Sequence, residues 1–536
     1  MLFLFPWIAF AQMQIGNVRK MKTGKVVTVS GIVTATFGEL SFVTDATGGI
    51  AVYQADVEAG DSISVTGKLS KYNGMLEIIV DSVGVFGSGG EILPVLMTIV
   101  DAMNHEGELV RIEDVTMQPA GLFFYPQRAG IAIHNKDTIQ YWIDENTDIP
   151  GYVIPEKTDI TGVVGRFGNR VQLLPRGHLD FSLPISHYPL PIDHFSVVNW
   201  NVEFFGAPRY GPPDDSLQIA NVATILTASK PDVAALQEVS NDDAFHTLLD
   251  LLPNYEGRCS SRYSYSFDTN DDFPPQKLCF VYNPATVKVI REKILFRQLF
   301  DDHPSEMFST GRLPYSLEVE VGGHRLFLIN LHAKSGADES DYQRRVADAG
   351  LLKDSLDQFY RYKDFILLGD LNDDVDQSIL AAHESPYAAL TTDYPCISRS
   401  LSDAGWHSTI AYDDMIDHQV VSSSLLDYHV TTQVLNPFSV VALYGRTTSD
   451  HLPVISEFDF DKSITGLAHD GTGRVYPNPT SGDIWFPPAS NITVIDAVGD
   501  VVIKKQGAYP PISLSEHAPG LYLVVLDDQI YRIVKK

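Results

Sequence analysis

The amino-terminal third of the chain alternates apolar and polar residues over short stretches. Residues 26–33 alternate in this way, and residues 63–69 do so again after a Gly-Asp turn. A period of two residues predicts half-buried β-strands. Hardly any helical periodicity interrupts the pattern between Val26 and Phe181, so we predict an all-β region there.

This β-rich region contains an internal repeat. The residues Thr66-Gly67, Leu69, Tyr72 and Glu77 align with Thr161-Gly162, Val164, Phe167 and Gln172, each 95 residues later. Two copies predict two small five-stranded β-barrels, residues 12–95 and 96–183. They resemble OB-fold modules, which implies single-strand binding through exposed aromatic side chains such as Tyr72 and Phe167. The alternative is a purely structural barrel in which these aromatics pack inside.

A Pro-rich stretch, residues 184–194, predicts a semi-rigid linker to a region with a different hydrophobic pattern. Beyond it, apolar strands (195–201, 233–237, 326–331 and 365–370) alternate with amphipathic helices (216–229 and 341–359). This alternation predicts an α/β sandwich over residues 195–459. The chain is therefore predicted to be multidomain, with a further β-rich segment over residues 470–536.

Polar residues lie at the ends of the apolar strands of the α/β region, where such folds place binding and catalytic groups. They are Asn201, Glu238, His332, Asp370, Asn372, Asp417, Asp450 and His451. Carboxylate and amide oxygens suit a hard divalent cation, whereas imidazoles suit phosphoryl oxygens and a leaving alkoxide. An Asp-Asn pair after one strand is by itself more often a turn, so the weight rests on the ordered set.

The same residues lie in six motifs that occur in one order. They are NWNVEFF, LQEV, INLHAKS, LLGDLND, MIDH and SDHLP. This set closely resembles the endonuclease/exonuclease/phosphatase superfamily, typified by deoxyribonuclease-I-like enzymes. The resemblance covers about half of the chain and implies a four-layer α/β sandwich that hydrolyses phosphodiester bonds with a divalent metal.

The resemblance implies a metal site. Glu238 would be the principal ligand, and Asn201 and Asp450 would complete or flank the site. We expect Mg²⁺, with Mn²⁺ or Ca²⁺ as alternatives, because Mg²⁺ keeps several waters and needs few protein ligands.

The resemblance also implies the catalytic roles. Asp370 would orient or deprotonate the attacking water, with Asn372 fixing it. His451 would contact the scissile phosphate, with its imidazole held by Asp417. His332 would be a second imidazole on the phosphate, and Arg312 would be a phosphate-binding arginine.

One position departs from the family pattern. Deoxyribonuclease-like members carry a glutamate that pairs with the first histidine, and here the aligned residue is Gln276. A neutral amide would not raise the pKa of His332. We therefore expect His332 to stabilise the phosphate rather than to act as the main general acid.

The charge composition limits how the chain can bind a polyanionic substrate. Lys and Arg number 39 against 68 Asp and Glu, so the formal net charge is −29. A broad basic face is therefore not expected, and a metal ion with a few local basic residues must neutralise the substrate. Lys334, Arg344, Arg345 and Arg446 lie near the motifs in sequence and are the candidates for such a local rim, with a solvated surface charge as the alternative for each.

Three cysteines exclude a disulfide-stapled scaffold and a Cys-rich zinc site. Cys259 and Cys279 flank a possible hairpin, and the sequence leaves open whether they are bridged or unpaired. Cys396 would then be the odd thiol.

Both ends of the chain indicate export. The apolar start and the Ala9-Phe10-Ala11 cleavage pattern predict a signal peptide over residues 1–11, although its basic region is missing. The elements PNPTSG and GLYLV near the carboxyl end resemble the sorting domain of the type IX secretion system. This resemblance implies secretion or surface display across the outer membrane of a Gram-negative bacterium, with the secretion machinery as a partner.

The leading hypothesis is a secreted, monomeric nuclease, most simply an endonuclease acting on DNA, and the sequence leaves open whether RNA is also a substrate. One alternative is a phosphodiesterase on a small or lipid phosphoester, such as a sphingomyelinase-like or inositol-phosphatase-like enzyme. Another is an inactive binding protein on the same scaffold. The intact set of acids, amides and imidazoles argues against the last.

Overall fold

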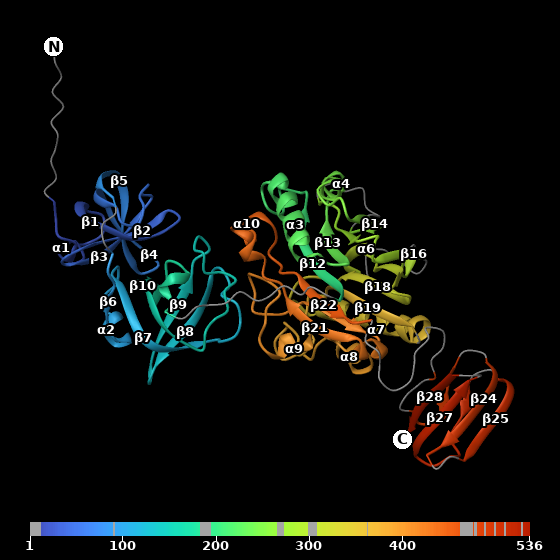
Figure 1. The fold of residues 1–536 in the computed structure, drawn as a ribbon. Coiled ribbons are helices and arrows are strands. Elements are labelled where there is room, and N and C mark those ends of the chain that lie inside the picture. Colours follow the sequence, from blue (N-terminus) through green and yellow to red (C-terminus); the bar gives the residue numbers. More distant parts are fainter. Residues whose placement is uncertain are drawn as a thin grey trace.

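The computed structural model describes residues 12–536 except 89–91, 183–193, 265–272, 298–307, 362, 461–474, 476–479, 487–488, 498–499, 509–510 and 527–528. The expected signal peptide and nearly all of the expected linker lie outside the described residues. Figure 1 shows two β-barrels, a larger α/β region and a small β-rich tail following one another along the molecule.

The first barrel is a closed sheet with the strand order β1-β2-β3-β5-β4. It contains α1 (Ile15–Val18), β1 (Val26–Phe37), β2 (Leu40–Asp45), β3 (Gly48–Tyr53), β4 (Ser62–Tyr72) and β5 (Met75–Gly87). Alternate residues of β4, such as Ile63 and Val65, are fully buried, because side chains of a strand point to opposite faces. The period-two pattern of the sequence therefore fills the barrel interior.

The second barrel has six strands in the order β10-β11-β9-β8-β7-β6, and a β10–β7 pairing closes it. Its elements are β6 (Val95–Leu96), α2 (Ile99–Ala102), β7 (Leu109–Gln118), β8 (Arg128–His134), β9 (Asp137–Ile143), β10 (Lys157–Phe167), β11 (Arg170–Leu174) and η1 (His178–Asp180). Five strands were expected, and the extra strand β6 is too short to show a periodicity.

The sequence repeat falls on corresponding hairpins, β4–β5 in the first barrel and β10–β11 in the second. Tyr72 and Phe167 lie at the tips of these hairpins and are 63% and 59% exposed. Neither ring therefore packs inside its barrel.

The α/β region is built on two sheets that face each other. The first sheet has the order β14-β15-β13-β12-β22-β21 and the second β16-β17-β18-β19-β20. Their strands are β12 (Phe195–Phe205), β13 (Val233–Val239), β14 (Glu256–Tyr263), β15 (Lys277–Tyr282), β16 (Val287–Ile294), β17 (Tyr315–Val321), β18 (His324–His332), β19 (Asp364–Asp370), β20 (Asp417–Val421), β21 (His429–Val434) and β22 (Val454–Phe458). A continuous apolar layer, including Val197, Phe280 and Leu328, fills the space between them.

Helices cover the outer faces of the two sheets (Figure 1). The helices α3 (Asp215–Ser229) and α4 (Asp242–Asp250) bury apolar residues against the first sheet, and α7 (Glu339–Ser355) does so against the second. The shorter elements are α6 (Phe308–Gly311), η2 (Leu356–Tyr360), α8 (Ala388–Asp393), α9 (Arg399–Asp403), η3 (Ser423–Asp427), η4 (Pro437–Ser439) and α10 (Tyr444–Thr447). The strand pairs β12–β13 and β18–β19 are parallel, so their carboxyl ends meet at one edge.

The second barrel packs directly on the α/β region. The rings of Phe123 and Trp406 meet edge to face with centroids 4.8 Å apart, and the Tyr125 hydroxyl donates to the carbonyl of His407 at 3.1 Å. Asn436 donates its amide to the carbonyl of Gly151 at 2.7 Å. One apolar cluster extends through both parts, whereas a linker alone would leave them separate.

The tail forms two small sheets, β23-β26 and β25-β24-β27-β28. Its strands are β23 (Asp483–Ile484), β24 (Ala489–Asp496), β25 (Val501–Ala508), β26 (Ile512–Ser513), β27 (Gly520–Leu526) and β28 (Gln529–Lys535). Ile484, Val494 and Val524 are among the residues of its separate apolar core.

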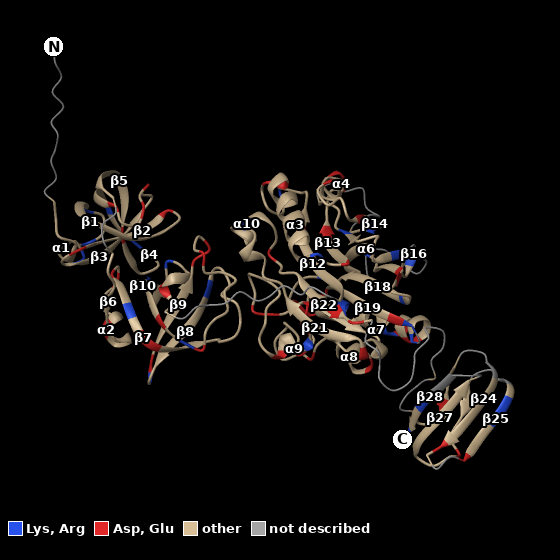
Figure 2. Ribbon diagram, viewed as in Figure 1, with Lys and Arg blue, Asp and Glu red and all other residues tan. Residues whose placement is uncertain are grey.

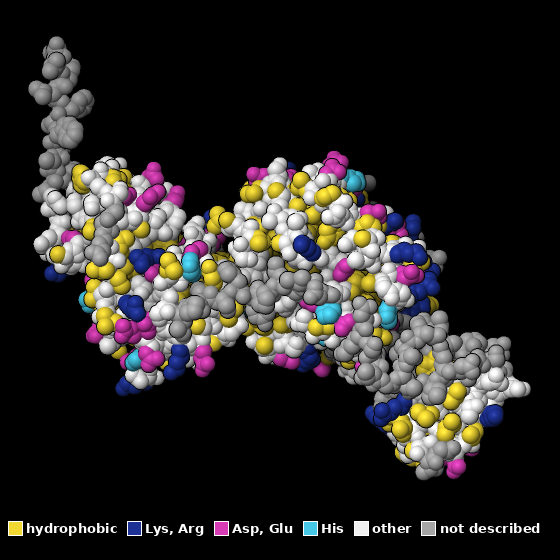
Figure 3. All heavy atoms as spheres, in the orientation of Figure 1, with side chains coloured by type: hydrophobic (Ala, Val, Ile, Leu, Met, Phe, Trp, Pro, Cys, Tyr) yellow, Lys and Arg dark blue, Asp and Glu magenta, His cyan; other side chains and the backbone are white. Residues whose placement is uncertain are grey.

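Acidic residues occur in every part of the molecule, as Figure 2 shows. Lys and Arg gather at the edge of the α/β region beside β16, which carries Lys288, Arg291 and Lys293 (Figures 2 and 3). Within the described part of the chain, no helix has the length and apolar character needed to cross a membrane.

Candidate active site

Eight of the nine predicted site residues line one cavity of about 410 Å³ at the carboxyl ends of β12, β13, β18 and β19. They are Asn201, Glu238, Arg312, His332, Asp370, Asn372, Asp450 and His451. The ninth, Asp417, lies fully buried behind His451. Strands distant in sequence thus bring the whole set to one place.

Asp370 ends β19 at the floor of this cavity. Its Oδ2 accepts a hydrogen bond from the Asn201 amide at 3.0 Å and lies 3.3 Å from Nε2 of His332. Its Oδ1 accepts from the backbone N–H of Asn372 at 2.9 Å. Burial raises the pKa of Asp370 to about 7, with His451 opposing the rise and Asp417 adding to it. A carboxylate with a pKa near neutrality can accept a proton from water and release it again.

His451 is paired with a buried carboxylate. Its Nδ1 lies 2.7 Å from Oδ2 of Asp417, and its Nε2 faces Asp370 at 3.9 Å. Burial by itself lowers the pKa of His451, but the charges of Asp417 and Asp370 outweigh burial and raise it well above its ordinary value. The imidazole is therefore held as a cation that can donate a hydrogen bond from Nε2.

His332 is in the opposite state. Burial and the neighbouring charges of Arg312 and His451 lower its pKa well below the ordinary value. Its Nδ1 has no hydrogen-bond partner within the described part of the chain. Gln276 does not supply one, because its side-chain oxygen accepts a hydrogen bond from Arg312 instead. The lowered pKa makes His332 a neutral imidazole near neutral pH.

Arg312 is anchored at the wall of the cavity by contacts with other segments. Its guanidinium donates to the Ala333 carbonyl at 2.9 Å and to the Ser309 hydroxyl at 2.6 Å, besides Gln276. Asn372 donates to the same Ala333 carbonyl at 3.2 Å. Arg312 is 3% exposed, so its charge acts in a site with little water.

Three further carboxylates line the cavity: Glu203, Glu238 and Asp450. Burial, with the charges of Asp450 and Glu238, raises the pKa of Glu203 to about 8. Burial also raises the pKa of Glu238, against the effect of Arg312. Glu203 was not among the predicted site residues, although it lies inside the NWNVEFF motif that could have indicated it.

Among the described residues, no group of three or more His, Cys, Asp or Glu side chains has an arrangement that would hold a metal ion. Of the three predicted ligands, Asn201 accepts the backbone N–H of Glu203 at 3.0 Å, and Glu238 accepts that of Phe204 at 2.9 Å. The acidic excess nevertheless fits a cation, because a positive charge here would offset the burial and the mutual repulsion that raise the pKa values of Glu203 and Glu238.

The backbone is strained where it carries these groups. Glu203, Phe204, Glu238 and Asn372 all have positive φ angles, between 45° and 62°. Non-glycine residues adopt this region rarely, and such residues cluster at functional sites. The strain supports the assignment of this cavity as the functional centre.

The expected basic rim is largely absent. Arg345 is completely buried and pairs with Asp373 at 2.8 Å, and Arg446 pairs with Glu145 of the second barrel. Of the four basic residues expected there, only Lys334 lines the cavity, where it pairs with Asp341 at 2.9 Å. Arg345 and Arg446 lie near the motifs in sequence, but their side chains instead form ion pairs that join different segments of the chain.

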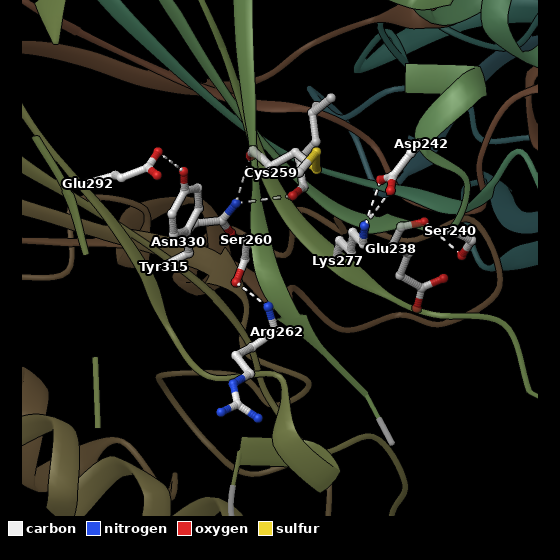
Figure 4. The surroundings of a disulfide bond; sticks show 12 residues. Glu238, Ser240, Asp242, Cys259, Ser260, Arg262, Lys277, Glu292, Tyr315 and Asn330 are labelled. Atoms are coloured by element: carbon white, nitrogen blue, oxygen red, sulfur yellow. Dashed lines mark hydrogen bonds and ion pairs between the residues drawn. A yellow bond between two sulfur atoms is a disulfide. The ribbon is translucent and has the colours of Figure 1, made fainter. Parts of the chain in front are cut away.

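The question of the two cysteines is settled by the structure. Cys259 and Cys279 face each other on the antiparallel strands β14 and β15 and form a disulfide, whereas Cys396 is free. Figure 4 shows that Asn330 donates to a carbonyl beside this bridge and that Lys277 pairs with Asp242 nearby. The bridge lies on the hairpin whose ends, at Ser264 and Gln276, line the cavity.

Comparison with known proteins identifies two parts of the chain. Residues 198–451 match the Endonuclease/Exonuclease/phosphatase family. The α/β region is an endonuclease/exonuclease/phosphatase domain. This confirms the resemblance drawn from the motifs, and members of this family hydrolyse phosphoester bonds. Residues 474–536 match the secretion system C-terminal sorting domain, which indicates type IX export to the cell surface or the medium.

The endonuclease/exonuclease/phosphatase domain also resembles individual proteins. Endonuclease YhcR of Bacillus subtilis is 28% identical over 200 residues, which cover 33% of this chain and only 16% of that protein.

The domain is also similar to three solved structures, and each similarity covers about half of this chain. An endonuclease/exonuclease/phosphatase from Bacteroides vulgatus has a TM-score of 0.39 at 15% identity, with 50% of this chain and 99% of that chain covered. Humanized D. rerio TDP2 has 0.38 at 16% identity (49% and 98% covered), and a mannosyl-6-phosphatase of Bacteroides thetaiotaomicron has 0.36 at 16% identity (50% and 100%).

Proposed function

We propose that this protein is an exported, metal-dependent nuclease that hydrolyses phosphodiester bonds in DNA and RNA. The observation that carries the proposal is the convergence of Asp370, His332 and the His451–Asp417 pair on one cavity. These groups can remove a proton from water and stabilise charge on a phosphate at the same time. The relative YhcR is named an endonuclease, which agrees with this substrate class.

Glu238, Asn201 and Asp450 would hold the divalent cation, and Glu203, which lines the same cavity, would supply a fourth oxygen ligand. We infer Mg²⁺, because a hard cation prefers carboxylate and amide oxygens. When bound, the metal supplies charge neutralisation for the phosphate and lowers the pKa of coordinated water.

The remaining residues have catalytic roles that follow from their charge states. Asp370 accepts a proton from the attacking water, and Asn201 and Asn372 keep its two oxygens oriented. His451, cationic through Asp417, donates to a phosphoryl or leaving oxygen. His332 and Arg312 contact the phosphate as a neutral donor and a fixed cation.

We also propose that the two barrels, residues 12–95 and 96–183, are OB-like modules that hold single-stranded substrate. Support comes from Tyr72 and Phe167, which are exposed at matching hairpin tips of the two barrels. Exposed aromatic rings stack on unpaired bases without regard to sequence.

The deciding experiment incubates the purified protein with supercoiled plasmid, single-stranded DNA, RNA, sphingomyelin and mannose 6-phosphate. Each substrate is tested with Mg²⁺, Mn²⁺ or Ca²⁺, with excess chelator, and with the Asp370→Asn variant as a matched control. We expect cleavage of the polynucleotides that chelator and the variant abolish. Full activity in chelator would exclude the metal-dependent mechanism, and turnover of sphingomyelin or mannose 6-phosphate alone would replace the nuclease assignment.

A further inference from the structure

Three aromatic side chains border the mouth of the catalytic cavity and have no part in the chemistry above. Phe204 and Phe273 line the cavity itself, and Tyr210 lies against both of them. Phe204 is the penultimate residue of β12, Tyr210 lies in the turn that follows, and Phe273 lies between β14 and β15. We call Phe204, Tyr210 and Phe273 the aromatic cluster.

The rings of the aromatic cluster pack on one another and still reach solvent. Their centroids are 5.6 Å apart for Phe204 and Tyr210, and 5.8 Å apart for each pair that includes Phe273. Tyr210 and Phe273 are nevertheless 44% and 39% exposed. Exposed aromatic rings beside a catalytic cavity, rather than in a core, indicate a contact surface for a ligand.

The cluster is joined rigidly to the catalytic groups. The backbone N–H of Phe204 donates to Oε2 of Glu238 at 2.9 Å, and Phe204 itself has a positive φ of 45°. A group stacked on these rings would therefore lie at a set distance from the phosphate-binding residues.

We propose that the aromatic cluster is a stacking subsite for one unpaired nucleobase next to the scissile phosphate, so that the enzyme favours single-stranded polynucleotide. This inference rests on the proposed nuclease function and names the form of its substrate. A flat base can lie on an exposed ring surface, and each such contact contributes substantially to binding.

A choline headgroup fits the cluster less well. A quaternary ammonium is bound by ring faces that surround it within about 6 Å of each centroid. Here the rings are in mutual contact at 5.6 to 5.8 Å, at tilted or edge-to-face angles, which leaves no room between them for a trimethylammonium group.

The test uses the full chain and a single-stranded dinucleotide, which offers one scissile phosphate and two bases. Either base is replaced in turn by a tetrahydrofuran abasic residue. The proteins are wild type, Tyr210→Ala, Phe273→Ala, the conservative Tyr210→Phe, and Phe359→Ala. Phe359 is 54% exposed in η2 and does not line the cavity, so it serves as the matched control.

We expect Tyr210→Ala and Phe273→Ala each to lower kcat/KM on the dinucleotide roughly 5- to 100-fold, the cost of one lost stacking contact. Phe359→Ala should leave it unchanged, and Tyr210→Phe, which keeps the stacking ring, should restore most of the activity that Tyr210→Ala loses. Removing one of the two bases should lower wild-type kcat/KM by a similar factor and should abolish the effect of both alanine variants, because the two changes delete the same contact.

Equal losses on base-bearing and abasic substrates would overturn the stacking subsite while leaving the nuclease assignment intact. Sphingomyelin hydrolysis that falls with both alanine variants would assign the cluster to a lipid headgroup and would also overturn it. Failure of the wild type to cleave any polynucleotide would instead remove the proposed function on which this subsite rests.

Discussion

Two imidazoles share one cavity here, yet their surroundings drive them to opposite protonation states. His451 has a carboxylate partner at 2.7 Å, whereas Nδ1 of His332 has no partner within the described residues. A cationic imidazole donates a stronger hydrogen bond to phosphate than a neutral one, so the two residues should differ in their effect on turnover.

His451→Ala should therefore cost more in kcat than His332→Ala, with a loss of roughly 10²- to 10⁴-fold for a general-acid or oxyanion-type contact. Asp417→Asn should reproduce part of the His451 loss, because it removes the charge that holds the imidazole protonated. Steady-state kinetics of the single and double variants measures both effects. A silent Asp417→Asn, or a more damaging His332→Ala, would show that the assignment of the acid is wrong.

At the scale of single elements, α7 contains a buried carboxylate whose charge disfavours folding. Asp348 is 4% exposed and accepts the backbone N–H of Phe308 with both oxygens, at 3.1 and 3.0 Å. Burial raises its pKa to about 6, although the Phe308 N–H and Arg344 lower it. The folded chain therefore binds a proton here at a pH where the unfolded chain does not.

The sign of the pH dependence follows. A free aspartate has a pKa of about 3.9, so between about pH 4 and 6 the folded state binds more protons and this group makes stability fall as pH rises. Asp348→Asn should consequently gain stability relative to wild type over that range, by up to about 3 kcal/mol at neutral pH. Urea unfolding from pH 4 to 8 measures it, with Asp354→Asn, an exposed position of the same helix, as the control.

The control variant Asp354→Asn should have the same free energy of unfolding as wild type at every pH. If the difference between Asp348→Asn and wild type were constant with pH, the carboxylate would not be the cause. A loss of stability at all pH values would show that the hydrogen bonds to Phe308 matter more than the charge.

The β14–β15 hairpin is the second element whose contribution to the stability of the fold can be tested. Its disulfide joins residues separated by 20 positions, and closing such a loop in the unfolded chain stabilises the fold by about 2–4 kcal/mol. Dithiothreitol should lower the melting temperature of wild type but not that of a Cys259→Ser, Cys279→Ser double variant. Equal melting of wild type with and without reductant would show that the bridge adds nothing.

For the whole molecule, the decisive feature is the contact between the second barrel and the catalytic domain. Phe123 is 1% exposed and packs on Trp406, and the apolar cluster around them includes residues of both parts. Parts that share a core are expected to unfold together rather than one after the other.

Phe123→Ala in the full chain should therefore destabilise the catalytic domain as well as the barrel, by about 3–5 kcal/mol for a buried phenylalanine. Phe86→Ala, on a 75% exposed residue of the first barrel, is the matched control and should have little effect. Calorimetry with hydrogen exchange on the catalytic strands measures the result. A shift confined to the barrel transition would show that the two parts fold independently.

Much of this molecule was predictable because the relevant signals are local in sequence. The period-two pattern predicted the barrel strands, and the alternation of apolar strands with helices predicted the α/β region. The ordered motifs identified Glu238, Asp370 and His451, because strand ends of one fold occur at characteristic places along the chain. The sorting domain was identified in the same way, from the motifs at the carboxyl end.

Only the tertiary structure decided which environment each of these residues has. The pKa of Glu203 depends on Asp450, the partner of Gln276 is Arg312, and Arg345 is buried against Asp373, all through contacts between distant segments. The same holds for the disulfide and for the docking of the second barrel. Sequence order specifies which side chains are present, but distance and burial set their charge states and partners, and these exist only once the chain has folded.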